Sequence, residues 1–196
     1  MTDLNENYWA QRYNNNDTSW DLGAPSSPLK AYFDQLTDKS VAILIPGAGN
    51  GYEAEYLFNI GFTNITLIDI AAQPLNNIKT RLPGFPHNKL ILGDFFDHEG
   101  KYELIIEQTF FCALHPSRRA DYVKKMHDLL HPGGKLVGVL FNDVLNADKP
   151  PFGGNKEEYS TLFQDHFQLK TLENCYNSIA PRANRELFIH FIRKQA

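Results

Sequence analysis

Residues 41–51 read VAILIPGAGNG, an apolar run followed by three glycines within five residues. The run Val41–Ile45 is continuous, as in a strand that is buried on both faces of a sheet. The glycines allow a sharp turn into a helix predicted over 51–60, with Gly61 as its stop, and they allow the backbone to approach a ligand closely. A tight strand-to-helix turn needs the same glycines, so the loop alone predicts geometry rather than function.

The alternation of strand and helix continues along the chain. Further strands are predicted at 65–68, 89–92, 102–106, 134–141, 167–172 and 187–193, and helices at 28–36, 73–82, 116–131 and 155–165. Helices separate the first five strands, which should run parallel, whereas the last two strands would most simply pair antiparallel. The sequence therefore predicts a doubly wound α/β fold: a seven-stranded, mostly parallel sheet with an antiparallel C-terminal pair and helices on both faces.

The first forty residues differ from this pattern. Residues 5–14 carry Tyr8, Trp9 and Tyr13, with helical spacing between Trp9 and Tyr13, and the polar run at 14–17 ends any helix there. We expect one domain of 196 residues. It would consist of a helical cap over the site at 1–40, a ligand-binding core at 41–141, and a lid loop, a helix and the strand pair at 142–196.

Acidic residues follow the second and third predicted strands. Asp69 ends the second strand, about 20 residues after Gly47, where nucleotide-binding sheets place a carboxylate that accepts hydrogen bonds from ribose hydroxyls. Asp94 and Phe95 follow the third strand, where a carboxylate and a backbone amide can contact an adenine edge. One acidic residue at a strand end is ordinary, but two beside a glycine loop favour a nucleotide-like ligand.

The spacing of the glycines limits the choice of nucleotide. A dinucleotide fingerprint, G-x-G-x-x-G, requires glycine at position 52, which is Tyr52, so a nicotinamide-dependent oxidoreductase is a weaker reading. No Lys-Ser/Thr pair follows the loop, which excludes a P-loop. The compact G-x-G-x-G loop, the two acidic residues and LHPGGKL at 130–136 together resemble the class I S-adenosylmethionine-dependent methyltransferases, whose core is Rossmann-like.

Flanking motifs narrow the resemblance. YWAQRY at 8–13 and WDLG at 20–23 resemble the N-terminal motifs of the thiopurine S-methyltransferase family. EQTFFCAL at 107–114, and PPFGG at 150–154 with Glu158 and Tyr159, are similar to the halide/thiol methyltransferase branch of that family. The resemblance covers nearly the whole chain.

This resemblance implies a set of binding residues. The residues implied to bind the cofactor, S-adenosylmethionine, are Trp9, Tyr13, Trp20, Gly47, Gly49, Gly51, Asp69, Ile70, Asp94, Phe95 and Gln108. The residues expected at the acceptor are Cys112, Phe141, Phe152 and Arg182. Gln108 departs from the Tyr or Arg of relatives, which bears on the acceptor more than on the cofactor.

Several of these residues have simpler explanations. Trp9 and Tyr13 could be the apolar stripe of an amphipathic helix, and Cys112 could be an inert buried thiol. Arg182 could be a surface charge or could attract an anionic acceptor. His115 precedes a predicted helix, which favours a cap over a base. Phe152, after two prolines, is expected to form the stiff apolar tip of a lid.

The predicted function is methyl transfer from S-adenosylmethionine to a small soft nucleophile: a thiol, thiopurine, bisulfide or halide. Such an acceptor needs no strong base, and we identify no general base and no catalytic residue, so catalysis should rest on proximity and desolvation. The alternatives are a methyltransferase for a different small molecule and a binding protein without activity. Amino-methylating nucleic-acid enzymes carry a Pro-Pro motif after the fourth strand, whereas KPPF at 149–152 follows the fifth.

Composition sets further bounds. The net charge of −4 and a pI near 6.0 argue against a nucleic-acid partner. Cys112 and Cys175 are too few for a disulfide framework, and the seven histidines show no metal-ligand spacing, so no metal is expected. The chain has no apolar run of membrane-spanning length and no signal peptide at its polar N-terminus. We therefore expect a cytoplasmic monomer with a small-molecule acceptor and no membrane partner.

Overall fold

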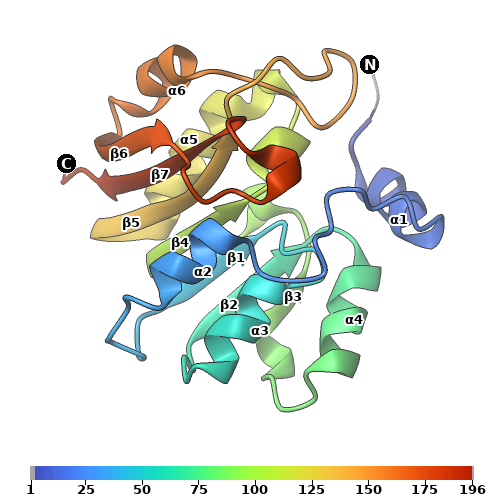
Figure 1. The fold of residues 1–196 in the computed structure, drawn as a ribbon. Helices are drawn as coiled ribbons and strands as arrows, with labels where there is room; N and C mark the ends of the chain where they lie inside the picture. Colours follow the sequence, from blue (N-terminus) through green and yellow to red (C-terminus); the bar gives the residue numbers. More distant parts are fainter. Residues whose placement is uncertain (1–2, 196) are drawn as a thin grey trace.

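A seven-stranded sheet in the order β3-β2-β1-β4-β5-β7-β6 runs through the molecule (Figure 1). The computed structural model describes residues 3–195. The strands are β1 (Ile43–Pro46), β2 (Ile65–Asp69), β3 (Leu90–Leu92), β4 (Tyr102–Gln108), β5 (Leu130–Phe141), β6 (Phe167–Asn174) and β7 (Glu186–Arg193). Strands β1 to β5 pair in parallel, and β7 runs antiparallel to both β5 and β6. The predicted fold class is confirmed.

Helices cover both faces of this sheet. The helices are α1 (Glu6–Asn14), α2 (Ser27–Phe33), α3 (Tyr52–Asn59), α4 (Ala72–Arg81), α5 (Arg119–Leu129) and α6 (Lys156–Phe163). In β1, Leu44 packs with residues of α5 and α6, whereas Ile43 and Ile45 pack with residues of α2, α3 and α4. The continuous apolar run of this strand therefore serves two cores, one on each side.

The strand order reverses between β1 and β4, which pair in parallel at the centre of the sheet. Ligands of doubly wound sheets bind outside the carboxyl ends of the strands at such a reversal. The glycine loop Gly47–Gly51 leaves β1 at this edge, and the turn 108–112 leaves β4 beside it. The topology thus brings two segments together that lie about 60 residues apart in the sequence.

Two of the differences from the predicted element boundaries have a clear structural basis. Strand β5 begins at Leu130 rather than at 134, because Leu130 pairs with Tyr102 and the register then shifts, with Leu104 opposite Lys135. The long helix predicted from 116 is a short 3-10 turn, Pro116–Arg118, followed by α5. Arg118, at φ −93° and ψ 0°, separates the two.

The helix α6 is capped by Asn155, but only half of a capping box forms. Asn155 accepts the amide of Glu158 at 2.9 Å. The Glu158 carboxylate instead pairs with Arg119 of α5. A cross-helix partner therefore replaces the local one.

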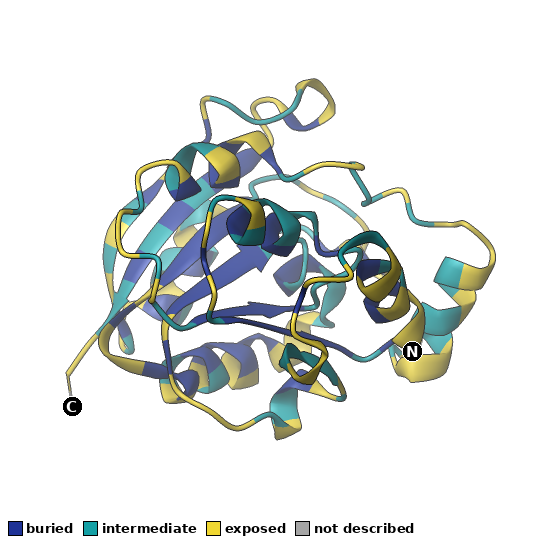
Figure 2. Cartoon of the chain, turned by 90° about the horizontal axis from the view of Figure 1, so that it is seen from below, coloured by how far each residue is buried: buried dark blue, intermediate teal, exposed yellow. Residues whose placement is uncertain are grey.

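The N-terminal helix α1 stands at the margin of the fold. It is the helix beside the N-terminus in Figure 2, where it carries no dark blue, because none of its residues is buried. Asn5 caps the helix by accepting the amide of Tyr8 at 3.1 Å. The aromatic residues of α1 are consequently not held in either core.

Candidate active site

A cavity of about 770 Å³ opens at the carboxyl edge of the sheet. Its walls come from the ends of β1, β2 and β4, the segment after β3, the N-terminal segment, and the loops around 145–151 and 181–185. The residues predicted to bind the cofactor all line it: Trp9, Tyr13, Trp20, Gly47, Gly49, Gly51, Asp69, Ile70, Asp94, Phe95 and Gln108. Of the expected acceptor residues, Cys112, Phe141 and Arg182 line it, and Phe152 does not.

The glycine loop has its conformation for reasons of packing. Gly47 has φ +56°, and a Cβ there would lie 2.3 Å from the Phe110 ring. Gly51 has φ +65° and precedes α3, and a Cβ there would lie 2.6 Å from Ile78. Both positions combine a left-handed backbone with a close neighbour, which only glycine tolerates. The loop therefore lies flush against the turn after β4 and against α4.

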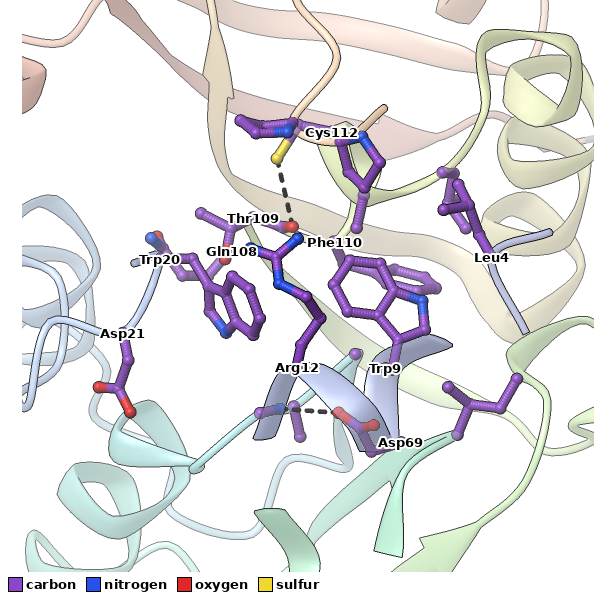
Figure 3. Close-up of a pocket in the computed structure, with 18 of the residues that line it drawn as sticks. Leu4, Trp9, Arg12, Trp20, Asp21, Asp69, Gln108, Thr109, Phe110 and Cys112 are labelled. Carbon is purple, nitrogen blue, oxygen red and sulfur yellow. Dashed lines mark hydrogen bonds between the residues drawn. The ribbon is translucent and has the colours of Figure 1, made fainter. Parts of the chain in front are cut away.

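Asp69 joins the end of β2 to this loop. Its Oδ2 accepts the amide of Gly49 at 2.9 Å (Figure 3), and its Oδ1 accepts the amide of Ala71 at 2.9 Å. Burial raises the pKa of this carboxyl group above its usual value, and the backbone amides act in the opposite direction. Asp69 lines the cavity, and each carboxylate oxygen can accept a further hydrogen bond.

Asp94 and Phe95 form the wall after β3. Asp94 accepts the amide of Phe96 at 2.8 Å and so caps the short turn Phe95–Asp97. The buried Phe95 ring meets the Phe110 ring edge to face, with centroids 5.1 Å apart. The sequence places both residues at the strand end, and this packing connects them to the turn after β4.

An aromatic cluster from the N-terminal segment covers the cavity. The Trp20 ring meets the rings of Trp9 and Tyr13 edge to face, at centroid distances of 5.6 and 5.7 Å. The Arg12 guanidinium lies 5.0 Å from the centroid of Trp20, and Figure 3 shows it between the two indoles. Helix α1 buries none of its residues, so Trp9 and Tyr13 are not packed into a core of the fold. Their rings pack on one another and line the cavity.

The segment after Trp20 is attached to the body of the protein at three points. Asp21 accepts a hydrogen bond from the side chain of Asn50 in the glycine loop. Ser26 donates its amide to the buried carboxylate of Glu53 at 2.9 Å. Arg182 donates to the carbonyl oxygen of Trp20 at 3.1 Å. Sequence reasoning missed these contacts, because each one joins segments that are distant along the chain.

Arg182 is not a surface charge. It is 8% exposed, and it faces Glu186 at 3.4 Å and the Phe141 ring at 5.6 Å. Its neighbour Arg185 also lines the cavity and pairs with Asp143. The part of the cavity beside Phe141 therefore carries guanidinium groups, of which Arg182 is the more enclosed.

The loop expected to act as a lid is hydrogen-bonded to the body of the protein. Phe152 is 2% exposed and packs edge to face on His115, so it is not the tip of a lid, and Pro150 and Pro151 line the cavity instead. Its amide donates to the carbonyl oxygen of Cys112 at 2.7 Å. Arg119 of α5 donates to the carbonyl oxygen of Gly153 at 2.6 Å. These bonds hold the loop to the turn after β4 and to α5.

Cys112 and His115 have structural partners. The Cys112 thiol donates to the carbonyl oxygen of Thr109 at 3.3 Å, and burial raises its pKa to about 12, which favours the inert reading. The His115 side chain accepts the amide of Ser117 at 3.2 Å, as expected for a cap. Gln108 lines the cavity, and its Oε1 is buried without a hydrogen-bond partner among the described residues. The cavity thus presents no activated nucleophile at these three positions.

No metal site and no membrane span emerge from residues 3–195. Within that range, no group of three His, Cys, Asp or Glu side chains is arranged to hold a metal ion. Similarly, none of the helices in the described part of the chain is long and apolar enough to cross a membrane.

The fold and the cavity define a class I methyltransferase, a class that uses S-adenosylmethionine, and solved structures show the same fold. A 1,6-didemethyltoxoflavin-N1-methyltransferase from Burkholderia thailandensis, solved with S-adenosylhomocysteine, superposes with a TM-score of 0.78 at 15% identity, over 97% of this chain and 87% of that structure. The chain belongs to the thiopurine S-methyltransferase family, whose model matches residues 4–193. It is a class I S-adenosylmethionine-dependent methyltransferase.

Relatives of this chain are named for different methyl acceptors. A probable thiol methyltransferase 2 of Arabidopsis thaliana is 26% identical over 192 residues, which span 95% of this chain and 84% of the relative. A thiocyanate methyltransferase 1 of Brassica oleracea is 24% identical over 194 residues, 93% of this chain and 83% of the relative. A thiopurine S-methyltransferase of Acinetobacter baylyi is 23% identical over 192 residues, 87% of this chain and 88% of the relative.

Proposed function

We propose that this enzyme transfers the methyl group of S-adenosylmethionine to a small sulfur nucleophile. The observation that carries the proposal is one continuous cavity in which the nucleotide-binding elements and an apolar, arginine-bearing wall face each other. The thiol, thiocyanate and thiopurine methyltransferases among the relatives support a sulfur acceptor. The alternative of a binding protein without activity gains no support from these relatives.

The residues of the cavity fit the cofactor. A volume of about 770 Å³ lies within the range of about 300–1,000 Å³ typical of small-molecule sites. Asp69 would accept hydrogen bonds from the ribose hydroxyls, and Asp94 with Phe95 would contact the adenine. The glycine loop would approach the amino-acid end closely, and the rings of Trp9, Tyr13 and Trp20 would face the sulfonium cation.

The chemistry proposed is an in-line displacement. S-adenosylmethionine supplies a methyl group on a positively charged sulfur, which is a good leaving group. The protein orients the acceptor against the wall of Phe141, Pro150 and Pro151 and excludes water under the aromatic cluster. A free thiol has a pKa near 8.5, so a useful fraction is ionised close to neutral pH. Arg182 would favour the anionic form of the acceptor through its charge.

No residue is required as a nucleophile. Cys112 keeps its proton because burial raises its pKa to about 12, and His115 is engaged with Ser117. We therefore propose catalysis by proximity and desolvation, without a covalent intermediate on the enzyme.

The experiment measures release of S-adenosylhomocysteine with acceptors in parallel: an aromatic thiol, a thiopurine, bisulfide, iodide and a short DNA duplex. Turnover with one or more of the sulfur acceptors, and none with DNA, supports the proposal. Turnover with DNA alone, or silence with all sulfur acceptors while cofactor binding is measurable, overturns it. A comparison of thermal shifts with NAD and with S-adenosylmethionine separates the oxidoreductase alternative.

We further propose a cytoplasmic monomer that does not bind nucleic acid. The net charge of −4 supports the last point, because phosphate backbones attract basic surfaces. Light scattering of the purified protein tests the oligomeric state, and fractionation of cells tests the location.

A further inference from the structure

The buried carboxyl group of Glu107, the second-to-last residue of β4, accepts three hydrogen bonds. Its Oε1 accepts the amides of Phe110 and Phe111, at 2.8 and 2.9 Å. Its Oε2 accepts the hydroxyl of Tyr122 at 2.5 Å. The residue is fully buried and does not line the main cavity. It therefore acts on the turn that follows it rather than on a ligand.

The turn held by Glu107 has an uncommon backbone. Thr109 has φ +58°, a left-handed conformation that is unfavourable for a β-branched residue. The next two amides point inward, and both are satisfied by the single oxygen Oε1 of Glu107. On the neighbouring strand β5, a Cβ on Gly138 would lie 2.1 Å from the carbonyl oxygen of Glu107, so the two strands approach closely at this residue. The carboxyl group thus compensates a strained turn from a fixed position.

The same turn contacts both halves of the cavity. On the cofactor side, the Phe110 ring lies against Gly47 of the glycine loop, where a Cβ would come within 2.3 Å. On the acceptor side, the carbonyl oxygen of Cys112 accepts the amide of Phe152 at 2.7 Å, which holds the wall of prolines. Figure 3 shows Thr109, Phe110 and Cys112 together along one side of the cavity. A displacement of this turn would change the separation of the two halves.

We propose that Glu107 is a positioning residue for methyl transfer: through the turn 108–112 it sets the distance between the glycine loop and the acceptor wall. The proposal rests on the proposed function, because in-line displacement is sensitive to the alignment of its three atoms. A misplacement of about 1 Å can cost about 100-fold in rate. Glu107 acts through Phe110 and Cys112 and touches neither substrate.

Two substitutions at this position distinguish the effect of the hydrogen bonds from the effect of side-chain volume. Glu107→Gln keeps an oxygen for the two amides and can donate to the Tyr122 oxygen. Glu107→Leu removes all three hydrogen bonds at similar volume. Leu129→Ala, in α5 at the opposite edge of the sheet, is the control for loss of core packing alone. Where Glu107→Leu does not fold, Glu107→Asp, which is one methylene shorter, replaces it.

The experiment measures the single-turnover rate at saturating cofactor and sulfur acceptor, per molecule that binds S-adenosylhomocysteine. We expect Glu107→Leu to lower this rate by about 10- to 100-fold and Glu107→Gln to stay within about threefold. Leu129→Ala should lower the melting temperature and leave the rate per binding site unchanged. An unchanged rate in Glu107→Leu, or an equal loss in Leu129→Ala, would overturn the positioning role.

If the proposed function fails, the positioning role of Glu107 is tested by a different measurement. If the wild type turns over no sulfur acceptor, that function fails, and positioning is judged on the dissociation constant of S-adenosylhomocysteine. Glu107→Leu should then weaken binding at least about fivefold, because Phe110 no longer supports Gly47, and Glu107→Gln should not. Equal affinities in the two variants would overturn the proposal.

Discussion

The carboxylate of Asp69 accepts the backbone amide of Gly49 at 2.9 Å and so joins the end of β2 to the loop after β1. A single side chain therefore supports the glycine loop and presents an acceptor to the cavity. In the sequence, the acidic residue and the glycines are separate motifs. In the fold, they form one unit at the carboxyl edge of the sheet.

Substitution of Asp69 by alanine should weaken cofactor binding. The change removes the proposed ribose contact and leaves the amides of Gly49 and Ala71 without their partner. We expect the dissociation constant of S-adenosylhomocysteine to rise by about 10- to 100-fold, since each lost hydrogen bond to a charged group contributes about 1.5–3 kcal/mol. Calorimetry measures it, with the exposed Asp121→Asn as control. Unchanged affinity in Asp69→Ala would contradict the proposed contact.

Phe152→Ala should lower the stability of the fold and should also raise the acceptor KM. The ring is 2% exposed, and removal of a buried phenylalanine costs about 3–5 kcal/mol. Because the amide of Phe152 bonds to Cys112, the loosened wall should raise the acceptor KM more than it weakens cofactor binding. Thermal unfolding and steady-state kinetics measure the two effects, and Phe152→Leu should show smaller ones. Equal changes in acceptor KM and cofactor affinity would contradict the proposal that this loop supports the acceptor wall.

Cys112→Ala should retain turnover. Burial raises the pKa of the thiol to about 12, so the thiolate is scarce at neutral pH and the side chain is not a nucleophile. We expect the kcat of the variant to be within about fivefold of the wild-type value. In the native wild-type protein, iodoacetamide should alkylate the Cys112 thiol slowly. Loss of turnover with intact cofactor binding would show that the enzyme uses this thiol, in conflict with a mechanism based on proximity.

Glu107→Gln should change the pH dependence of stability. Burial raises the folded-state pKa of Glu107 to about 7, above the ordinary value of 4.5. Between these two values the folded protein binds more protons than the unfolded chain, so the stability contributed at low pH is lost as the pH rises. Gln does not titrate, so the stability of the variant relative to the wild type should increase between pH 5 and pH 8, by up to about 3 kcal/mol.

Chemical denaturation at several pH values measures this difference. Titratable groups near Glu107 are Tyr122 from α5, Cys112, Tyr159 from α6, and Glu186 from β7. They are common to both proteins and cancel in the comparison. A difference that does not vary with pH would mean that the carboxyl group keeps an ordinary pKa.

The fold was predictable because its signals are local. A continuous apolar run such as Val41–Ile45 has few alternatives to a strand with two covered faces. The glycines that follow allow a turn into the next helix, which begins directly after Gly51. The start of β5 was not predictable, because Leu130 joins the strand only through its pairing with Tyr102, beyond an intervening Pro-Gly-Gly. Pairing across strands overrides the turn signal there.

The predicted site residues other than Phe152 gather in one cavity for a topological reason. Asp69 and Asp94 end neighbouring parallel strands, so their positions follow from the strand assignment. The burial of Phe152 and Arg182 could not be predicted, because it depends on contacts with His115 and with Trp20, which are distant from them in the sequence. Glu107 is the first residue of the EQTFFCAL motif, and its role could not be predicted because its amide partners come together only in the folded turn.

The most direct test of the function follows the methyl group itself. The enzyme is incubated with S-adenosylmethionine that carries an isotopically labelled methyl group and with an aromatic thiol, and the products are identified by mass spectrometry. We predict an S-methyl thioether with the label intact, together with an equal amount of S-adenosylhomocysteine. Formation of S-adenosylhomocysteine without a labelled thioether, or label on a nitrogen or oxygen of the acceptor, would contradict methyl transfer to sulfur.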